Sequence, residues 1–111
     1  MALILAYQHR YCTRVITIRD VGGNTITPGV NDEIRVMIGR EGETPKLTVA
    51  SNAPTAAGSS FSKGVANRLR LDASDLDFEP GVYTAMFDYY DHADASEWKN
   101  IERQVFYLEL T

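Results

Sequence analysis

The side chains that could support nucleophilic catalysis are few, because the chain has one cysteine, Cys12, and two histidines, His9 and His92. An activated nucleophile needs a histidine base within hydrogen-bond reach and an acid that orients this base. His9 lies beside an N-terminal strand and His92 lies in an acidic turn. A catalytic site shared with Cys12 would form only if the fold happened to bring one of these histidines next to the thiol. A lone cysteine is usually a small core residue, and it can form no internal disulfide and no multi-cysteine zinc site. We therefore predict that the protein is not an enzyme and has no catalytic residues.

Carboxylates are more numerous, and they gather in two turns: one holds Asp72, Asp75, Asp77 and Glu79, and the other holds Asp91, Asp94, Ser96 and Glu97. Acid–base cleavage of glycosides needs two carboxylates across a cleft, which a single turn does not supply. Neither turn has the central glycine and terminal glutamate of a helix-flanked calcium loop. No glycine-rich phosphate-binding motif occurs either. We predict no metal site and no cofactor.

The formal charge of −4 is distributed unevenly along the chain. Residues 1–70 hold nine Lys or Arg and five Asp or Glu, a net +4, whereas residues 71–111 hold two and ten, a net −8. The basic residues are too sparse to predict nucleic-acid binding. If the two halves stay separate after folding, they favour head-to-tail contacts between copies or docking on a charged lattice. The alternative is that the acidic part simply forms solvated loops.

A chain of 111 residues fits one domain with a core of ordinary size, so we predict a single domain over residues 1–111. The first residues are apolar, but they have no basic leader and are shorter than a signal-peptide core. No segment is long and apolar enough to span a membrane, and the expected setting is a reducing cytoplasm. Residues 1–12 are a candidate extended N-terminal arm, whose Ala2–Gln8 stretch could add as a strand to a neighbour's sheet.

Alternation of apolar and polar residues, which is typical of half-buried strands, recurs along the chain, and helical periodicity does not. The alternation is clearest at Glu33–Gly39. Val82–Tyr90 is richest in β-forming residues and predicts a central strand, with which Gln104–Leu110 would pair. Further strands are predicted at residues 2–8, 13–20, 47–49 and 69–71. About seven strands at such spacing predict a sandwich of two sheets.

Two long connections are expected to carry binding residues, because loops of such length in a compact domain tend to be functional. Residues 51–64 are small and flexible apart from Phe61, which either packs into its own core or inserts into a neighbouring subunit. Residues 91–103 are polar and contain Trp98. Together with the N-terminal segment, these loops give the predicted interface residues: Leu3, Leu5, Tyr7, Arg10, Phe61, Lys63, His92 and Trp98.

The stretch before the predicted central strand has the features of a tyrosine corner. Pro80 and Gly81 turn the chain, and Tyr83 then starts the strand, so that its ring can be buried while its hydroxyl reaches back to the backbone of the turn. With Phe78 in the apolar place, the stretch resembles the apolar-x-x-Gly-x-Tyr corner of bacterial and phage immunoglobulin-like domains. The strand and glycine turn of residues 16–24, which end in Val-Gly-Gly-Asn, are similar to the opening of small tailed-phage virion domains.

This resemblance implies an all-β fold, an immunoglobulin-like antiparallel β-sandwich of about seven strands. It also implies a structural protein of a bacteriophage virion, foremost a capsid decoration or cement subunit that stabilises the assembled particle through protein–protein contacts. The implied partners are the major capsid protein or other virion proteins, with copies forming a homo-oligomer or binding to a lattice, and the implied location is the virion, assembled in the host cytoplasm. A baseplate or tail adaptor is the alternative within the same family. From the residues alone, a carbohydrate-binding module also stays open, because Tyr89, Tyr90 and Trp98 could stack on sugar rings.

Overall fold

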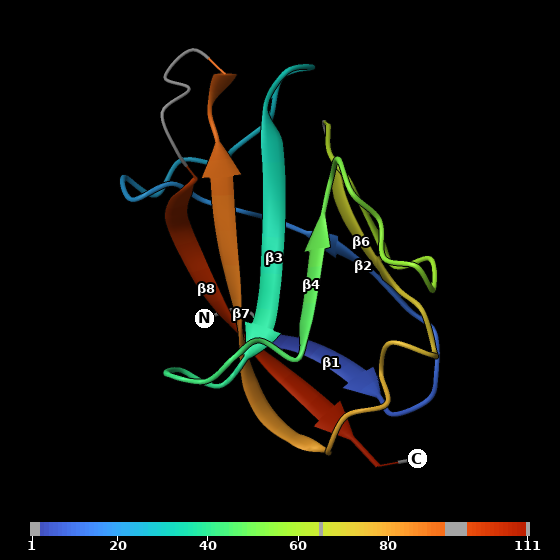
Figure 1. Cartoon of the computed structure of the whole chain (residues 1–111). Coiled ribbons are helices and arrows are strands. Elements are labelled where there is room, and N and C mark those ends of the chain that lie inside the picture. The colour runs from blue at the N-terminus through green and yellow to red at the C-terminus, as the bar shows by residue number, and fades with distance from the viewer. Residues whose placement is uncertain (1–2, 65, 93–97, 111) are drawn as a thin grey trace.

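The computed structural model describes residues 3–64, 66–92 and 98–110, which form eight β-strands (Figure 1). The strands are β1 (Leu3–Tyr7), β2 (Cys12–Ile16), β3 (Glu33–Gly39), β4 (Leu47–Ala50), β5 (Ser60–Ser62), β6 (Asn67–Leu71), β7 (Gly81–Tyr90) and β8 (Lys99–Glu109). The predicted all-β class is confirmed. Within the described part of the chain, no helix is long and apolar enough to cross a membrane.

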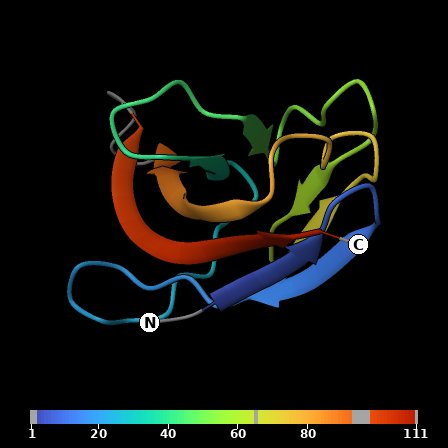
Figure 2. The same cartoon turned by 90° about the horizontal axis from the view of Figure 1, so that it is seen from below.

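The strands form two sheets that pack as a sandwich. The five-stranded sheet, which we call sheet A, has the order β1-β8-β7-β3-β4, and the three-stranded sheet B has the order β2-β6-β5. Figure 2 shows how β8 curves past β7 and runs beside β1. All pairings are antiparallel except that of β1 with β8, which is parallel. The orders β2-β6-β5 and β8-β7-β3 correspond to the B-E-D and G-F-C orders of immunoglobulin-like sandwiches.

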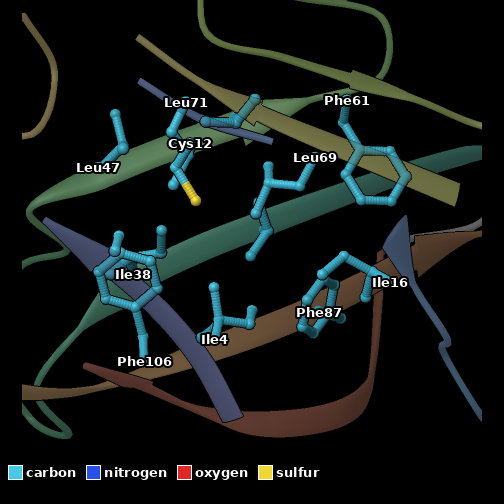
Figure 3. Packing of buried hydrophobic residues seen from close by; sticks show 14 of the residues in the cluster. Ile4, Cys12, Ile16, Ile38, Leu47, Phe61, Leu69, Leu71, Phe87 and Phe106 are labelled. Atoms are coloured by element: carbon cyan, nitrogen blue, oxygen red, sulfur yellow. The ribbon is translucent and has the colours of Figure 1, made fainter. Parts of the chain in front are cut away.

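The core lies between the two sheets and follows the predicted alternation. In β3 every second side chain, from Ile34 to Ile38, is fully buried, and the residues between them face outward. Figure 3 shows side chains of sheet B, such as Leu69, facing those of sheet A, such as Ile38 and Phe87. Burial of one face of each sheet is the main force that stabilises such a sandwich.

The tyrosine corner predicted at Pro80, Gly81 and Tyr83 is present. Tyr83 is only 2% exposed, and its hydroxyl donates a hydrogen bond to the backbone carbonyl of Glu79. The Phe78 ring meets the Tyr83 ring edge-on, with 5.1 Å between the ring centroids. Gly81 has φ of 152°, a conformation that disfavours any side chain. The corner thereby fixes where β7 enters the centre of sheet A.

Four expectations about the elements differ from the structure. The strand predicted at residues 13–20 spans Cys12–Ile16. The connection over residues 51–64 contains a strand, β5, because Ser60–Ser62 pairs with β6. The connection after β7 is shorter than predicted, since β8 begins at Lys99 and pairs with the end of β7 beyond a bulge at Phe87/Asp88. The candidate N-terminal arm is, over Leu3–Tyr7, a strand of the chain's own sheet, because its backbone pairs with β8.

Side-chain hydrogen bonds hold the connections against the sandwich. Ser59, which is fully buried, donates to the Asp75 carboxylate and accepts from the backbone N–H of Asp72. Thr55 donates to the same carboxylate oxygen. Two members of the first acidic turn therefore have a structural role, since they tie the β4–β5 connection to the β6–β7 connection.

Candidate protein interface

The outer face of sheet A carries the largest set of apolar side chains that point away from the core. Inward residues of β1, β8 and β7, such as Ile4, Phe106 and Tyr83, are buried. Since successive side chains of a strand point to opposite faces, the residues between them face outward. We call the following six outward residues the apolar face: Leu3, Leu5, Tyr7, Val82, Val105 and Tyr107.

The strand registers place five of these six side chains in two adjacent rows, whereas Tyr7 is opposite Glu109. Leu5 is opposite Tyr107 on β8, which in turn is opposite Val82 on β7. Leu3 is opposite Val105 in the next row. Directly opposite residues have Cβ atoms about 5 Å apart, so the rows form one continuous surface that spans three strands.

Large parts of the apolar face are open to solvent. The exposed fractions are 61% for Leu3, 56% for Val82 and 42% for Tyr7, whereas Leu5, Val105 and Tyr107 are half-buried. A contiguous exposed apolar surface typically marks a site of interaction with another protein, and tyrosine is enriched at the centre of such interfaces. This surface is the strongest candidate functional site among the described residues.

A polar cluster lies further along sheet A, beyond the pair of Met86 and Arg103 that separates it from the apolar face. Arg35 of β3 forms an ion pair of 2.6 Å with Asp88 of β7, and Asn100 of β8 donates to the second oxygen of this carboxylate. The guanidinium carbon of Arg35 lies 4.5 Å from the centroid of the Trp98 ring. Trp98 also contacts the Tyr90 ring at 5.7 Å. One side of the indole is thus covered by a charged group of the same chain.

Three of the predicted interface residues, Leu3, Leu5 and Tyr7, belong to the apolar face. They reach it as part of β1, and the outer edge of that strand is partly occupied. The Arg14 guanidinium donates to the Leu5 carbonyl, and the Arg10 backbone N–H donates to the Tyr7 carbonyl. The N-terminal segment therefore contributes its side chains to a face of the chain's own sheet, and the expected pairing with a neighbour's sheet edge is not needed to order it.

Phe61 was predicted at the interface, which the structure corrects, and Lys63, also predicted there, is held by contacts within its own chain. The Phe61 ring is 3% exposed and packs in the chain's own core, because β5 turns it inward (Figure 3). The Lys63 ammonium donates to the Glu33 carboxylate at 2.9 Å and to the backbone carbonyls of Val30 and Asp32. Both side chains are used within the fold.

The remaining predicted residues do not gather at one place. His92 is exposed, and its backbone N–H donates to the Asp32 carboxylate. Arg10 is exposed in the turn after β1, where it lines an open depression of about 630 Å³ with His9, Tyr11 and Ala73. The lining offers no carboxylate and no hydroxyl or thiol nucleophile beyond the tyrosine phenol. Trp98 belongs to the polar cluster described above.

The structure also describes the surroundings of side chains that were considered for catalysis or metal binding. Cys12 is buried, and this burial raises the pKa of its thiol, which keeps it protonated. No three His, Cys, Asp or Glu residues converge as metal ligands in the described ranges. Of the second acidic turn, Asp94, Ser96 and Glu97 lie outside the described residues.

Sequence reasoning missed half of the apolar face. Val82, Val105 and Tyr107 were placed only within two predicted strands, and no side of these strands was assigned to solvent. The signal that could have found them is the unusual apolar character of both sides of these strands, since a sheet with one face in water normally alternates apolar with polar residues.

We compared the chain with protein-family models, with curated proteins and with solved structures, and none of them matches it.

Proposed function

We propose that this protein is a non-enzymatic structural subunit that binds other protein surfaces through the apolar face. The observation that carries the proposal is the pair of adjacent rows in which Leu3, Leu5 and Val82 stand beside valine and tyrosine side chains of β8. The rows are backed by a rigid sheet, so little conformational entropy is lost when a partner covers them.

Within this proposal, the particle is that of a tailed bacteriophage, and the foremost role is capsid decoration, with a baseplate or tail adaptor as the alternative. The tyrosine corner at Tyr83 and the glycine reversal at Gly23, where φ is 84°, support the assignment, since both are the motifs on which the resemblance to phage virion domains rests. The immunoglobulin-like strand order agrees with it. A decoration subunit needs a stable fold and a docking face, and both are at hand in a chain of this size.

The test uses a variant that removes the apolar face without touching the core. Leu3→Lys with Val82→Lys places two charges in the face, and both sites are exposed, so the fold should persist. The matched control is Val21→Lys with Val30→Lys, which makes the same change of charge at two valines of the β2–β3 connection that are 94% and 87% exposed. Circular dichroism confirms that all three proteins are folded.

The genes that flank the gene of this protein identify the phage particle. The wild type, the Leu3/Val82 variant and the control are then mixed with the capsids of this phage and, separately, with its tails. We expect the wild type and the control to sediment with one of the two particles and the Leu3/Val82 variant to lose at least about tenfold in affinity. Equal binding of all three proteins would disprove the role of the apolar face. The phage assignment would be disproved if the flanking genes encode no virion proteins, or if the wild type binds neither capsids nor tails.

A further inference from the structure

The turn between β1 and β2 borders an open depression whose lining carries hydrogen-bond donors and no carboxylate. The depression measures about 630 Å³ and is lined by His9, Arg10, Tyr11 and Ala73. Ala73 comes from the β6–β7 connection, and the His9 backbone N–H donates to the Leu76 carbonyl of this connection at 2.9 Å. A backbone hydrogen bond between two distant parts of the chain therefore holds the walls of the depression together.

The donors that line the depression have no partner within the described part of the chain. The side chains of His9, Arg10 and Tyr11 are exposed, and none of them has a hydrogen bond or ion pair to a described residue. Arg70 adjoins them, since its guanidinium carbon lies 5.8 Å from the centroid of the Tyr11 ring. The guanidinium groups of Arg10 and Arg70 thus lie at one depression without a counterion from the described residues.

The carboxylates closest in sequence to the wall of the depression are bonded elsewhere. Asp72 is buried, and its carboxylate accepts from the backbone N–H of Ser74. The Asp75 carboxylate accepts from the hydroxyls of Thr55 and Ser59. Because these bonds hold both carboxylates within the fold, the positive charge at the depression is left for a ligand from outside.

The positive charge continues from the depression along β6. Arg68 and Arg70 are exposed and point to the same side of this strand, because the residues on either side of each are buried. Their cross-strand neighbours include no acidic residue and are Thr13, Val15, Ser60 and Ser62. We call Arg10, Arg70 and Arg68 the basic track, which starts in the depression and runs along the outer face of sheet B.

We infer that the basic track binds an acidic segment of a partner protein. Residues two apart in an extended chain are roughly 6.5 Å apart, so carboxylates at alternate positions of such a segment have the spacing of Arg68 and Arg70. The donors of the depression then receive a further carboxylate. A guanidinium group binds a carboxylate through two parallel hydrogen bonds. Each exposed ion pair contributes little, so the segment binds through several pairs formed together.

A nucleic acid fits the basic track less well than an acidic segment does. The protein has a net charge of −4, so a polyanion that extends past the track is repelled by the rest of the surface. Proteins that bind single strands typically offer aromatic rings on which bases stack. Here the Tyr11 ring already has the Arg70 guanidinium beside it. The inference concerns the β1–β2 turn and sheet B, and it does not rest on the apolar face of sheet A.

An NMR titration that follows the backbone amide signals tests the inference with a short peptide in which glutamate alternates with threonine. With peptide at up to about 5 mM, which suffices for weak binding, we expect saturable shifts at Tyr11, Arg68 and Arg70. The shifts should appear at about 10 mM salt, where the Debye length is about 30 Å, and vanish at about 1 M, where it is about 3 Å. Absence of these shifts at low salt would overturn the inference.

Two further peptides test which feature of the ligand is recognised. A peptide in which glutamine replaces every glutamate should cause no shifts, because it has no charge. A peptide with the same number of glutamates at every third position should bind at least about threefold more weakly, because its carboxylates lie on alternate sides of an extended chain. Equal binding of the glutamine peptide would overturn the inference, and equal binding of the third-position peptide would overturn the match of spacing.

Charge reversal locates the binding site on the protein. Arg10→Glu with Arg70→Glu should weaken binding of the alternating peptide at least about tenfold, because attraction is replaced by repulsion. Arg10→Gln with Arg70→Gln, which removes the charges and disturbs the fold less, should weaken it in the same direction. The matched control is Lys46→Glu with Arg103→Glu, an equal change of charge at exposed residues outside the basic track. Circular dichroism checks that each variant is folded, and equal weakening by the control would overturn the site.

Two other ligands, titrated in the same buffer, separate an acidic segment from other anions. A short single-stranded DNA and inorganic phosphate should each bind more weakly than the alternating peptide. Tighter binding of the DNA, or equally tight binding of phosphate, would overturn the inference. Leu3→Lys with Val82→Lys should leave peptide binding unchanged, so failure of the proposed function and failure of this inference are distinguishable.

Discussion

The ionisation of Asp32 is tied to the fold by three hydrogen-bond donors. Its carboxylate accepts from the backbone N–H groups of His92 and Gly29 and from the Tyr89 hydroxyl, each at 2.9 Å. The backbone bond from His92 contributes most to holding the pKa of Asp32 below its ordinary value of 3.8. Burial, with a smaller contribution from the Asp32 charge, raises the pKa of Tyr89 to about 12. One carboxylate therefore links the β2–β3 connection to the end of β7.

We predict a pH dependence of opposite sign for these two groups. Because the pKa of Asp32 is lowered by folding, its contribution to stability is present above pH 3.8 and is lost as the pH falls through the lower folded value. Because the pKa of Tyr89 is raised, its contribution is present below pH 10 and is lost as the pH rises toward 12. Urea denaturation as a function of pH measures both.

Asp32→Asn and Tyr89→Phe assign the two effects. The stability difference between wild type and Asp32→Asn should vanish in acid, and the difference between wild type and Tyr89→Phe should shrink in strong alkali. A constant difference across the acid range would show that the Asp32 charge is not what stabilises the fold.

At the scale of elements, a bulge at Ile101 of β8 sets the polar cluster of sheet A. The register of β7 on β8 shifts between Phe87 and Asp88, which brings Asn100 opposite Asp88. The Asp88 side chain is 8% exposed and that of its ion-pair partner Arg35 is 30% exposed. The Arg35 Nε is buried without a hydrogen-bond partner among the described residues, so the guanidinium depends on Asp88 for neutralisation.

We predict that Asp88→Ala destabilises the fold by about 1–3 kcal/mol. The change leaves a half-buried cation without its counterion, and water that reaches Arg35 reduces the cost below that of a fully buried pair. In a double-mutant cycle with Arg35→Met, the cost of the double variant should be smaller than the sum of the single costs. Urea denaturation supplies the four free energies. Additive costs would mean that the two side chains act independently.

Elements with a regular apolar stripe could be predicted from the sequence, and irregular ones could not. The strand at β3 and the central strand at β7 follow from period-two alternation, and Tyr83 marked the start of β7. The strand β5 was missed because Ser60–Ser62 has a single apolar residue, and only pairing with β6 orders it. Residues 99–103 of β8 were missed because polar side chains there give no alternation.

At the scale of the whole molecule, the candidate interface depends on contacts that are distant in sequence. Leu3 and Leu5 were predicted as interface residues, but only the parallel register of β1 on β8 shows that they stand beside Val105 and Tyr107. The error at Phe61 has the same origin, since its ring is turned inward by the pairing with β6 of β5, a strand that has no local signal. Local patterns predict strands, whereas register decides which side chains share a surface.

We predict that β1 joins the structure late during folding. Its pairing with β8 closes a loop that contains almost the whole chain, which is costly in entropy. Ile4→Val should therefore cost about 0.5–1.5 kcal/mol and appear mainly as faster unfolding, with little change in the refolding rate. Ile38→Val in the centre of sheet A is the matched control and should slow refolding. Stopped-flow chevron plots measure both, and equal slowing of refolding in the two variants would contradict late docking of β1.

The pairing of the first strand with the last has a consequence for translation. The Leu3–Tyr7 segment leaves the ribosome well before the strand that holds it in place, because β8 follows it by most of the described chain. Until then the leucines and tyrosine of this segment have no valine and tyrosine neighbours beside them. A polypeptide that stops before β8 thus lacks the finished apolar face, so a partner that recognises the proposed docking surface would select copies in which β8 is made and folded.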